Sequence, residues 1–379
     1  MIHLVPDARL QNGRIVVRDR IQPERRAENN CQHKIHFVNS FSTMSKEDYT
    51  KKANGLSLFS GGLDSQLAIR VLERAGAHVE AVTFVTPFFS PETAIKAADA
   101  LGVKLHLVDF TGDEIDLIKN PPHGFGSAMN PCIDCHATMI RRAGELMEKM
   151  GFDFIATGEV VNQRPMSQNK QALGTVEKSS GFKGRLIRPL SALLLEPTIP
   201  ETQGLVDRSK LLDLSGRRRE RQTELAKEFE ITDYPSPAGG CKLTEQGFSR
   251  KLKDLMVHEG LDERRLVELL TVARRFRLPG GSSVILGRDA ADNKKLESVR
   301  IETDTLLAPV SVPGPTAIVP KLNSPEDLPV AAGIVCAWSK FDRFTGDAIT
   351  VKAITGEKRE DIMVPAPFSR DPFLQYQIT

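Results

Sequence analysis

A short segment near residue 60 constrains the fold more than any other part of the sequence. The apolar run Leu56 to Phe59 leads into Ser60-Gly61-Gly62-Leu63-Asp64-Ser65, and an amphipathic helix pattern follows from Gln66 to Ala75. Two glycines permit the unusual dihedral angles and close backbone approach of a tight turn. Amide groups at the N-terminus of the next helix supply hydrogen-bond donors and partial positive charge for an anion. The segment therefore predicts a phosphate-binding turn, with the hydroxyls of Ser60 and Ser65 as further donors.

The turn lacks the Gly-x-x-x-x-Gly-Lys-Ser/Thr pattern of kinases and GTPases, so a different use of ATP is expected. An ordinary strand-to-helix loop is the alternative, because Gly-Gly pairs are common in such loops. The complete set of hydroxyls, glycines and carboxylate, placed where an anion site needs to be, favours nucleotide binding.

Strand-like and helical segments alternate from Leu56 to about Pro200, which predicts a parallel sheet with helices on both faces. Strands are expected over 56–59, 79–84, 104–109 and 154–157, and helices over 66–75, 91–101 and 137–150. The expected fold is α/β and doubly wound, with nucleotide at the carboxyl ends of the strands. Three residues are expected at this edge and are candidates for contacting adenine and ribose, namely Thr83, Thr157 and Gly158. The alternative is that they are ordinary strand ends without a ligand.

Three cysteines lie in loops or at a helix start. Cys132 and Cys135 form a Cys-x-x-Cys that opens a helix pattern, which suits a redox pair or a metal site. Cys241 ends the turn-rich segment 235–241. The three could hold three irons of a [4Fe–4S] cluster, and a disulfide, a persulfide or thiols that never meet are the alternatives. Zinc would need His136 or an acid as its fourth ligand, and Cys336 is interpreted as a core residue of a strand over 333–338.

Composition sets outer bounds. With 379 residues, 40% of them hydrophobic, the chain is expected to form two or three domains. No apolar run is long enough to span a membrane, no signal peptide is visible, and five cysteines do not make a disulfide framework. A cytoplasmic protein without a membrane partner is expected. Residues 1–53 look unlike the rest and are expected to be a disordered or mis-assigned extension, with Met44 as the true start and Cys31 without a role.

The segment Ser-Gly-Gly-x-Asp-Ser resembles the motif of the PP-loop ATP pyrophosphatases, which cleave ATP between its α and β phosphates and transfer AMP to a substrate oxygen. Across residues 54–245 this turn is followed by Asn130-Pro-x-x-x-Cys, Ala156-Thr-Gly and an isolated Cys241. That order is similar to the tRNA thiouridine synthases, both the 2-thiouridylases and the 4-thiouridine synthases. The resemblance implies an adenine nucleotide alpha hydrolase-like (HUP) fold and an ATP-dependent tRNA sulfurtransferase that forms AMP and pyrophosphate.

The mechanism that this resemblance implies has two steps. ATP, with Mg²⁺ held by its phosphates and by Asp64, adenylates a uracil carbonyl oxygen, and sulfur delivered at Cys132, Cys135 or Cys241 displaces AMP. Asp64 could instead cap the helix N-terminus, and both roles can coexist. The nucleotide would be bound by Ser60, Gly61, Gly62, Asp64 and Ser65. Implied partners are tRNA and a sulfur donor, either a cysteine desulfurase or sulfide, and a homodimer is left open.

A basic segment follows the presumed catalytic domain. Residues 264–300 contain nine Arg or Lys against four Asp or Glu and resemble a small RNA-binding domain of the NFACT type, expected as a smaller α+β domain over 246–379. A basic surface without a ligand is the alternative. The arginine run 217–221, in a helix expected over 209–230, is interpreted as a solvated face because acids interleave. RNA contacts are expected from Arg164, Arg274, Arg275, Arg277, Arg288, Lys294 and Lys295.

Two other function classes stay open at this point. A PP-loop enzyme could adenylate a small carboxylate or amide, and it would then be indifferent to RNA. Alternatively, the chain could be an RNA-binding protein with a vestigial nucleotide site. The sequence does not say which nucleotide is modified or which donor supplies sulfur.

Overall fold

The computed structural model describes residues 53–164, 167–236, 241–341 and 344–379, together with three short strands at 8–11, 14–17 and 36–37. The chain divides into two compact units. The first unit is His33–Thr271, and the second combines Val272–Thr379 with Met1–Gln32. The hypotheses about Met44 and Cys31 lie outside the described residues. Near the N-terminus, β1 (Ala8–Gln11) and β2 (Arg14–Val17) form an antiparallel pair.

The first unit is built on a parallel sheet with the strand order β3-β6-β5-β4-β7-β8. The first long strand, β4, lies in the middle, with β5 on one side and β7 on the other. This reversal of strand order creates a crevice at the carboxyl ends, where such sheets bind ligands. The strands are β3 (His36–Phe37), β4 (Asn54–Leu58), β5 (His78–Val85), β6 (Leu105–Asp109), β7 (Phe154–Ala156) and β8 (Leu186–Ile187).

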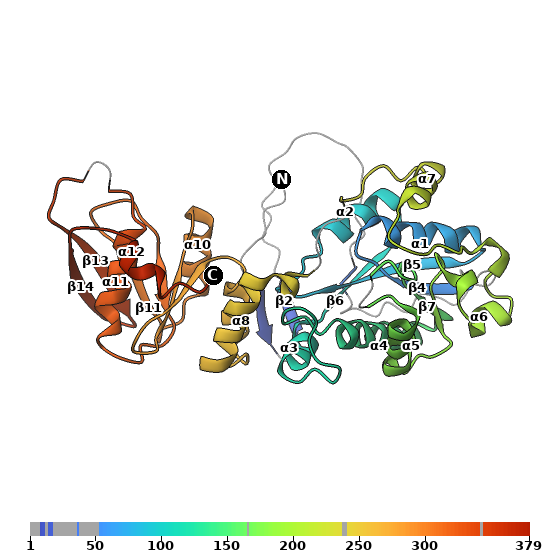
Figure 1. Ribbon diagram of the computed structural model, residues 1–379, viewed down its shortest axis with the longest axis horizontal. Coiled ribbons are helices and arrows are strands. Elements are labelled where there is room, and N and C mark those ends of the chain that lie inside the picture. Colours follow the sequence, from blue (N-terminus) through green and yellow to red (C-terminus); the bar gives the residue numbers. More distant parts are fainter. Residues whose placement is uncertain are drawn as a thin grey trace. The chain divides into compact units, whose positions relative to one another are not determined.

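Helices cover both faces of this sheet, with α1 and α2 on one side and α3, α4 and α5 on the other (Figure 1). The predicted doubly wound α/β fold is therefore confirmed. The helices of the first unit are α1 (Leu63–Arg74), α2 (Glu92–Leu101), α3 (Thr111–Lys119), α4 (Cys132–Met150), α5 (Lys170–Ser180), α6 (Ile199–Thr202), α7 (Glu220–Glu228), α8 (Gln246–His258) and α9 (Arg264–Leu269). Three 3₁₀ turns are η2 (Ala192–Leu194), η3 (Arg208–Lys210) and η4 (Lys242–Thr244).

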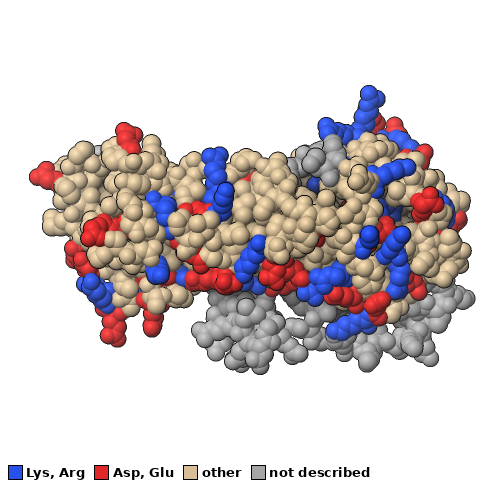
Figure 2. All heavy atoms as spheres, turned by 60° about the horizontal axis from the view of Figure 1, so that its bottom comes forward, with Lys and Arg blue, Asp and Glu red and all other residues tan. Residues whose placement is uncertain are grey.

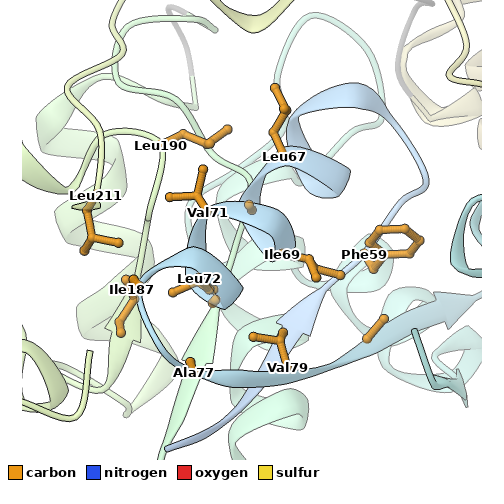
Figure 3. Packing of buried hydrophobic residues seen from close by; sticks show 14 of the residues in the cluster. Phe59, Leu67, Ile69, Val71, Leu72, Ala77, Val79, Ile187, Leu190 and Leu211 are labelled. Atoms are coloured by element: carbon orange, nitrogen blue, oxygen red, sulfur yellow. The ribbon is translucent and has the colours of Figure 1, made fainter. Parts of the chain in front are cut away.

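Each face of the sheet has its own hydrophobic core, because successive strand residues point to opposite sides. On one face, Leu67, Val71 and Leu72 of α1 pack against the sheet and against residues that follow β8 (Figure 3). On the other face, Val82 and Phe84 of β5 pack against α4 and α5. The helix α1 is thereby fixed directly behind the turn that precedes it.

The helix expected over 209–230 is wrong in its first half, since only residues 220–228 are α-helical and the segment begins in the short 3₁₀ turn η3. Gly216 has φ +88°, a left-handed conformation that interrupts a helix. Before it, the amides of Leu212 and Leu214 donate to Pro189 and Leu190 carbonyls, and Ser215 pairs with Val161. This segment is therefore extended against the first unit, and the arginine run lies in a loop that enters α7.

The second unit contains an antiparallel sheet with the order β14-β13-β11-β12-β10-β9, which confirms the smaller α+β domain. Helix α11 packs on it, and Cys336 is fully buried there as predicted. The strand expected over 333–338 is wrong, because the continuous apolar run forms α11 instead. The elements are β9 (Arg274–Arg277), β10 (Ser283–Leu286), α10 (Ala290–Val299), β11 (Thr305–Pro309), β12 (Ala317–Val319), α11 (Asp327–Ala337), β13 (Ala348–Thr355), β14 (Lys358–Pro365) and α12 (Asp371–Leu374).

Candidate functional site

The turn between β4 and α1 has the geometry that its glycines predict. Gly61 has φ +76°, and a Cβ atom there would lie 2.4 Å from the Thr93 carbonyl oxygen at the start of α2. The Ser65 hydroxyl donates to the Gly62 carbonyl at 2.8 Å, and the Gly62 amide donates to the Ser60 hydroxyl at 3.3 Å. Ser60 is exposed at the end of β4, and the first amides of α1, which have no acceptor within the helix, follow directly after it.

Gly158, after β7, lies against the first turn of α1. A Cβ atom at this position would come within 2.7 Å of the Asp64 carbonyl carbon and the Ser65 nitrogen. Only glycine allows this approach, so the Ala156-Thr157-Gly158 segment lies directly beside the turn. Thr157 is 5% exposed, and its hydroxyl donates to Glu159 at 3.0 Å. Thr83 is also buried, and its hydroxyl donates to the Phe59 carbonyl at 2.5 Å, directly before the turn.

Asp64 receives two hydrogen bonds on one carboxylate oxygen. Its Oδ2 accepts from Gln163 Nε2 and from Arg219 Nη2, each at 3.0 Å. Its Oδ1 is buried and has no hydrogen-bond partner among the described residues. A carboxylate oxygen beside a phosphate turn is the type of ligand that Mg²⁺ prefers, so Asp64 fits the expected metal ligand.

The three site cysteines belong to the first unit, and Cys132 lies close enough to Cys135 and Cys241 to influence their ionisation. Cys132 is the first residue of α4, and its sulfur accepts from Asn130 Nδ2 at 3.1 Å. Cys135 is buried one turn later, and Cys241 precedes η4, where its sulfur accepts from the Leu243 amide at 3.4 Å. Cys132 contributes to the raised pKa of both other cysteines. A joint role for the three thiols stays a prediction.

A buried carboxyl group, Glu114 on α3, accompanies these thiols. Burial raises the pKa of Glu114 to about 7, although hydrogen bonds with Thr86 and Cys135 oppose the shift. The Cys135 thiol lies 3.8 Å from Glu114 Oε1. Burial and then Glu114 raise the pKa of Cys135 well above its usual value, and the same two causes raise the pKa of Cys241 to about 12. Negative charge is therefore disfavoured in this cluster until a cation or an electrophile is present.

A second buried network connects α4 with the end of β7. Glu159 accepts hydrogen bonds from His136 Nδ1 at 3.2 Å and from Arg188 Nε at 2.9 Å. Burial opposes ionisation of Glu159, but the charge of Arg188 and the contact with His136 hold its pKa at about 2. Arg188 also donates to Glu177 at 3.0 Å and is almost fully buried. The network connects the helix that carries Cys135 to the strand end beside the phosphate turn.

Among the described residues, no group of three or more His, Cys, Asp and Glu side chains is arranged to hold a single metal ion. The expected [4Fe–4S] cluster is a different case, since its cysteine ligands bind separate irons. Burial raises the pKa of Cys135 and Cys241, and a bound cation cluster would stabilise their thiolates. Cysteine is the residue type that holds such clusters, and a cluster held by Cys132, Cys135 and Cys241 stays a prediction.

The basic residues of the second unit differ in their exposure to solvent and in their hydrogen-bond partners. Arg275 is 2% exposed and is not positioned as a surface contact. Arg277 donates to the Gly281 carbonyl at 2.7 Å, and Arg288 makes an ion pair with Asp292 at 2.6 Å. Burial, and then the nearby charges of Arg370 and Arg288, lower the pKa of Arg274. Lys294 and Lys295 are exposed on α10, and in the first unit Arg164 is exposed.

The surface charge is mixed. On the face shown in Figure 2, basic and acidic side chains are interspersed. This agrees with a formal net charge of only +2. Any affinity for an RNA backbone would therefore come from local groups of cations and would fall with added salt.

Three of the site residues, namely Glu114, Arg188 and Arg219, were not predicted from the sequence. A signal existed for Glu114, because Thr111, Glu114, Ile115 and Ile118 form the buried stripe of α3 with helical spacing. Arg219 was assigned to a solvated face, and this interpretation is wrong, since its side chain is 26% exposed and pairs with Asp64.

Comparison with known families follows the same division of the chain. Residues 50–196 match the family model described as thiamine biosynthesis protein (ThiI). Residues 273–376 match the family model described as NFACT protein RNA binding domain. The resemblance to these two families is confirmed.

Curated relatives match the ThiI-like part. A probable tRNA sulfurtransferase of Thermotoga maritima is 32% identical over 145 residues, which are 35% of this chain and 35% of that protein. The tRNA-specific 2-thiouridylase MnmA of Sulfurimonas denitrificans is 31% identical over 115 residues, covering 27% of this chain and 33% of that protein. The chain thus spans about a third of the length of the curated relatives it matches.

Among solved structures, a predicted subunit of tRNA methyltransferase from Methanocaldococcus jannaschii aligns with a TM-score of 0.31 and 18% identity, over 46% of this chain and 76% of that one. Separately, no helix in the described part of the chain is both long and apolar enough to cross a membrane.

Proposed function

We propose that this protein is an ATP-dependent tRNA sulfurtransferase that replaces a uracil carbonyl oxygen with sulfur. The observation that supports this most strongly is the shared location of two kinds of chemistry. The phosphate turn at Ser60 and the thiols at Cys132, Cys135 and Cys241 belong to one unit, and His136, Glu159 and Gly158 connect them in a chain of contacts. The names of the relatives and the NFACT-type match support tRNA as the substrate.

In the proposed first step, the uracil oxygen attacks the α-phosphorus of ATP and pyrophosphate leaves. Amides at the start of α1 would stabilise the charge that develops on the phosphates, because they are fixed before the reaction begins. Mg²⁺ would be held by Asp64 and would neutralise part of the same charge.

In the second step, a sulfur nucleophile attacks the activated carbon, the carbon–oxygen bond breaks, and AMP leaves with the oxygen. If one cysteine carries the sulfur as a persulfide, a second cysteine must attack its S–S bond, and a thiol reductant must then reduce the resulting disulfide. The pair of Cys135 and Cys241 would serve this route. If a [4Fe–4S] cluster is bound by the three cysteines, its open iron would supply a binding position for sulfide.

The proposal is tested with the full chain, unmodified tRNA, ATP, Mg²⁺ and a cysteine desulfurase with cysteine, or sulfide. Nucleosides from the digested tRNA are analysed by mass spectrometry, and AMP and pyrophosphate are quantified. Thiouridine that requires ATP, disappears in Cys135→Ser and persists in Cys336→Ser is the expected result. AMP formation that a small metabolite stimulates and tRNA does not would favour small-molecule adenylation. Binding of tRNA without AMP formation, unchanged in Asp64→Asn, would indicate a vestigial nucleotide site.

A further inference from the structure

Helix α7 is fixed alongside α1 at both ends. Near the C-termini, Arg74 makes an ion pair with Glu228 at 2.9 Å. Near the N-termini, Arg219 makes an ion pair with Asp64 at 3.0 Å. The two helices therefore run in the same direction, and Figure 1 shows them side by side. The N-terminus of α7 thus lies beside the phosphate turn.

The N-terminus of α7 has an unusual charge. Helix N-termini carry partial positive charge and favour acidic side chains. Glu220 in the first turn of α7 follows this rule, but Arg217, Arg218 and Arg219 come directly before it and add three cations to the same end. Such an arrangement is favourable where an anion lies close by.

Most of the hydrogen-bonding capacity of Arg219 is not used by Asp64. A guanidinium has five N–H donors in a planar fork, and Asp64 accepts from only one nitrogen. The Nε atom is buried and has no hydrogen-bond partner among the described residues. Gln163 donates to the same Asp64 oxygen, so the carboxylate holds both side chains in place beside the turn.

We propose that Arg219 is a phosphate-contacting residue of the nucleotide site and that Asp64 positions it. The guanidinium of Arg219 would contact the β and γ phosphates, the part of ATP that leaves as pyrophosphate. The α1 amides would contact the same phosphates from the side of the turn. This inference rests on the proposed nucleotide site and adds to it a cation from a distant segment. Arginine suits the role because its planar donors match phosphate oxygens.

The test compares Arg219→Gln with Arg221→Gln. Arg221 is a matched control on the same helix, since it is exposed and pairs with Asp213 at 2.7 Å. Binding of Mg·ATP, AMP and adenosine is measured by calorimetry for both variants and for the unaltered protein. Arg219→Gln should weaken Mg·ATP binding about tenfold or more, which is the effect of one charged hydrogen bond, and should leave adenosine binding unchanged. Arg221→Gln should change neither.

Two results would overturn the inference. Unchanged ATP affinity in Arg219→Gln would show that the guanidinium does not contact the phosphates. An equal loss of affinity for adenosine and ATP would show that Arg219 only holds α7 in place. Arg219→Lys, which keeps the charge, would then restore the affinity for both ligands equally. If the unaltered protein binds ATP no better than adenosine, the proposed nucleotide function itself fails. Thermal unfolding of each variant confirms that the fold is retained.

Discussion

Replacing Glu114 with glutamine removes the buried carboxyl group from the thiol cluster. The pKa of Glu114 is about 7 in the folded protein, against an ordinary value of 4.5. That difference corresponds to about 3 kcal/mol of extra cost for ionising the group in the folded state. Because the folded protein holds the proton more tightly, protonated Glu114 contributes fully to stability below the unfolded pKa of 4.5. This contribution is lost as the pH rises through about 7.

The expected magnitude follows from these two values. Between about pH 5 and about pH 8, ionisation of Glu114 should lower the free energy of unfolding by about 2.5 kcal/mol, and Glu114→Gln should lose this part of the pH dependence. The variant should therefore gain stability over the unaltered protein as the pH rises. Glu145→Gln is a matched control, because Glu145 is a carboxyl on the neighbouring α4 with a side chain that is 46% exposed.

The assay must report on the first unit. The single tryptophan, Trp338, lies in the second unit, so its fluorescence is unsuitable. Hydrogen exchange measured by mass spectrometry in peptides from α3 and α4, over a series of urea concentrations, gives local unfolding free energies. The same pH dependence in Glu114→Gln, Glu145→Gln and the unaltered protein would show that Glu114 does not ionise with a raised pKa.

Three further predictions concern neighbouring residues. Glu159→Gln should destabilise the first unit by about 3 kcal/mol or more at neutral pH, because it leaves Arg188 buried without that charge. In the unaltered protein, the stabilisation that ionised Glu159 provides should disappear as the pH falls from 4.5 through about 2. An unchanged urea midpoint in the variant would contradict this. Gly158→Ala should lower stability by about 1–3 kcal/mol and weaken ATP binding, because its Cβ would meet the α1 backbone. Gly174→Ala, in open space on α5, should be neutral or stabilising. Equal melting temperatures for the two variants would contradict the close contact at Gly158. In chelator-treated protein, alkylation of Cys241 by iodoacetamide should accelerate steadily above about pH 8, because its pKa is about 12. A rate that is already constant there would contradict the raised pKa.

Local patterns in the sequence predicted those parts of the site that local chemistry determines. The Ser60 turn, the alternation of strands and helices, and the position of Cys132 at a helix start depend on neighbours within a few residues. The same holds for Gly158, although the reason for glycine there, contact with the Asp64 backbone, is visible only in the structure.

Pairings between distant segments were not predictable in this way. Arg219 and Asp64 are 155 positions apart, and charge interleaving around Arg219 has the same pattern as a solvated surface. The apolar run at 333–338 fits a buried strand or a buried helix equally well, and packing on the second sheet decided for the helix. The broken helix over 209–230 depended on backbone pairing with residues 161 and 189–190.

The pairing of α7 with α1 also has a consequence for synthesis on the ribosome. The phosphate turn is translated early, but Gln66 is held by the Asp233 carbonyl and Asp64 by Arg219, both more than 150 positions downstream. Closing such long loops costs chain entropy before the contacts form. A nascent chain that has emerged only as far as β8 therefore has the glycine turn without its contacts to Arg219 and Asp233. It should acquire tight nucleotide affinity only after residue 233 has left the exit tunnel.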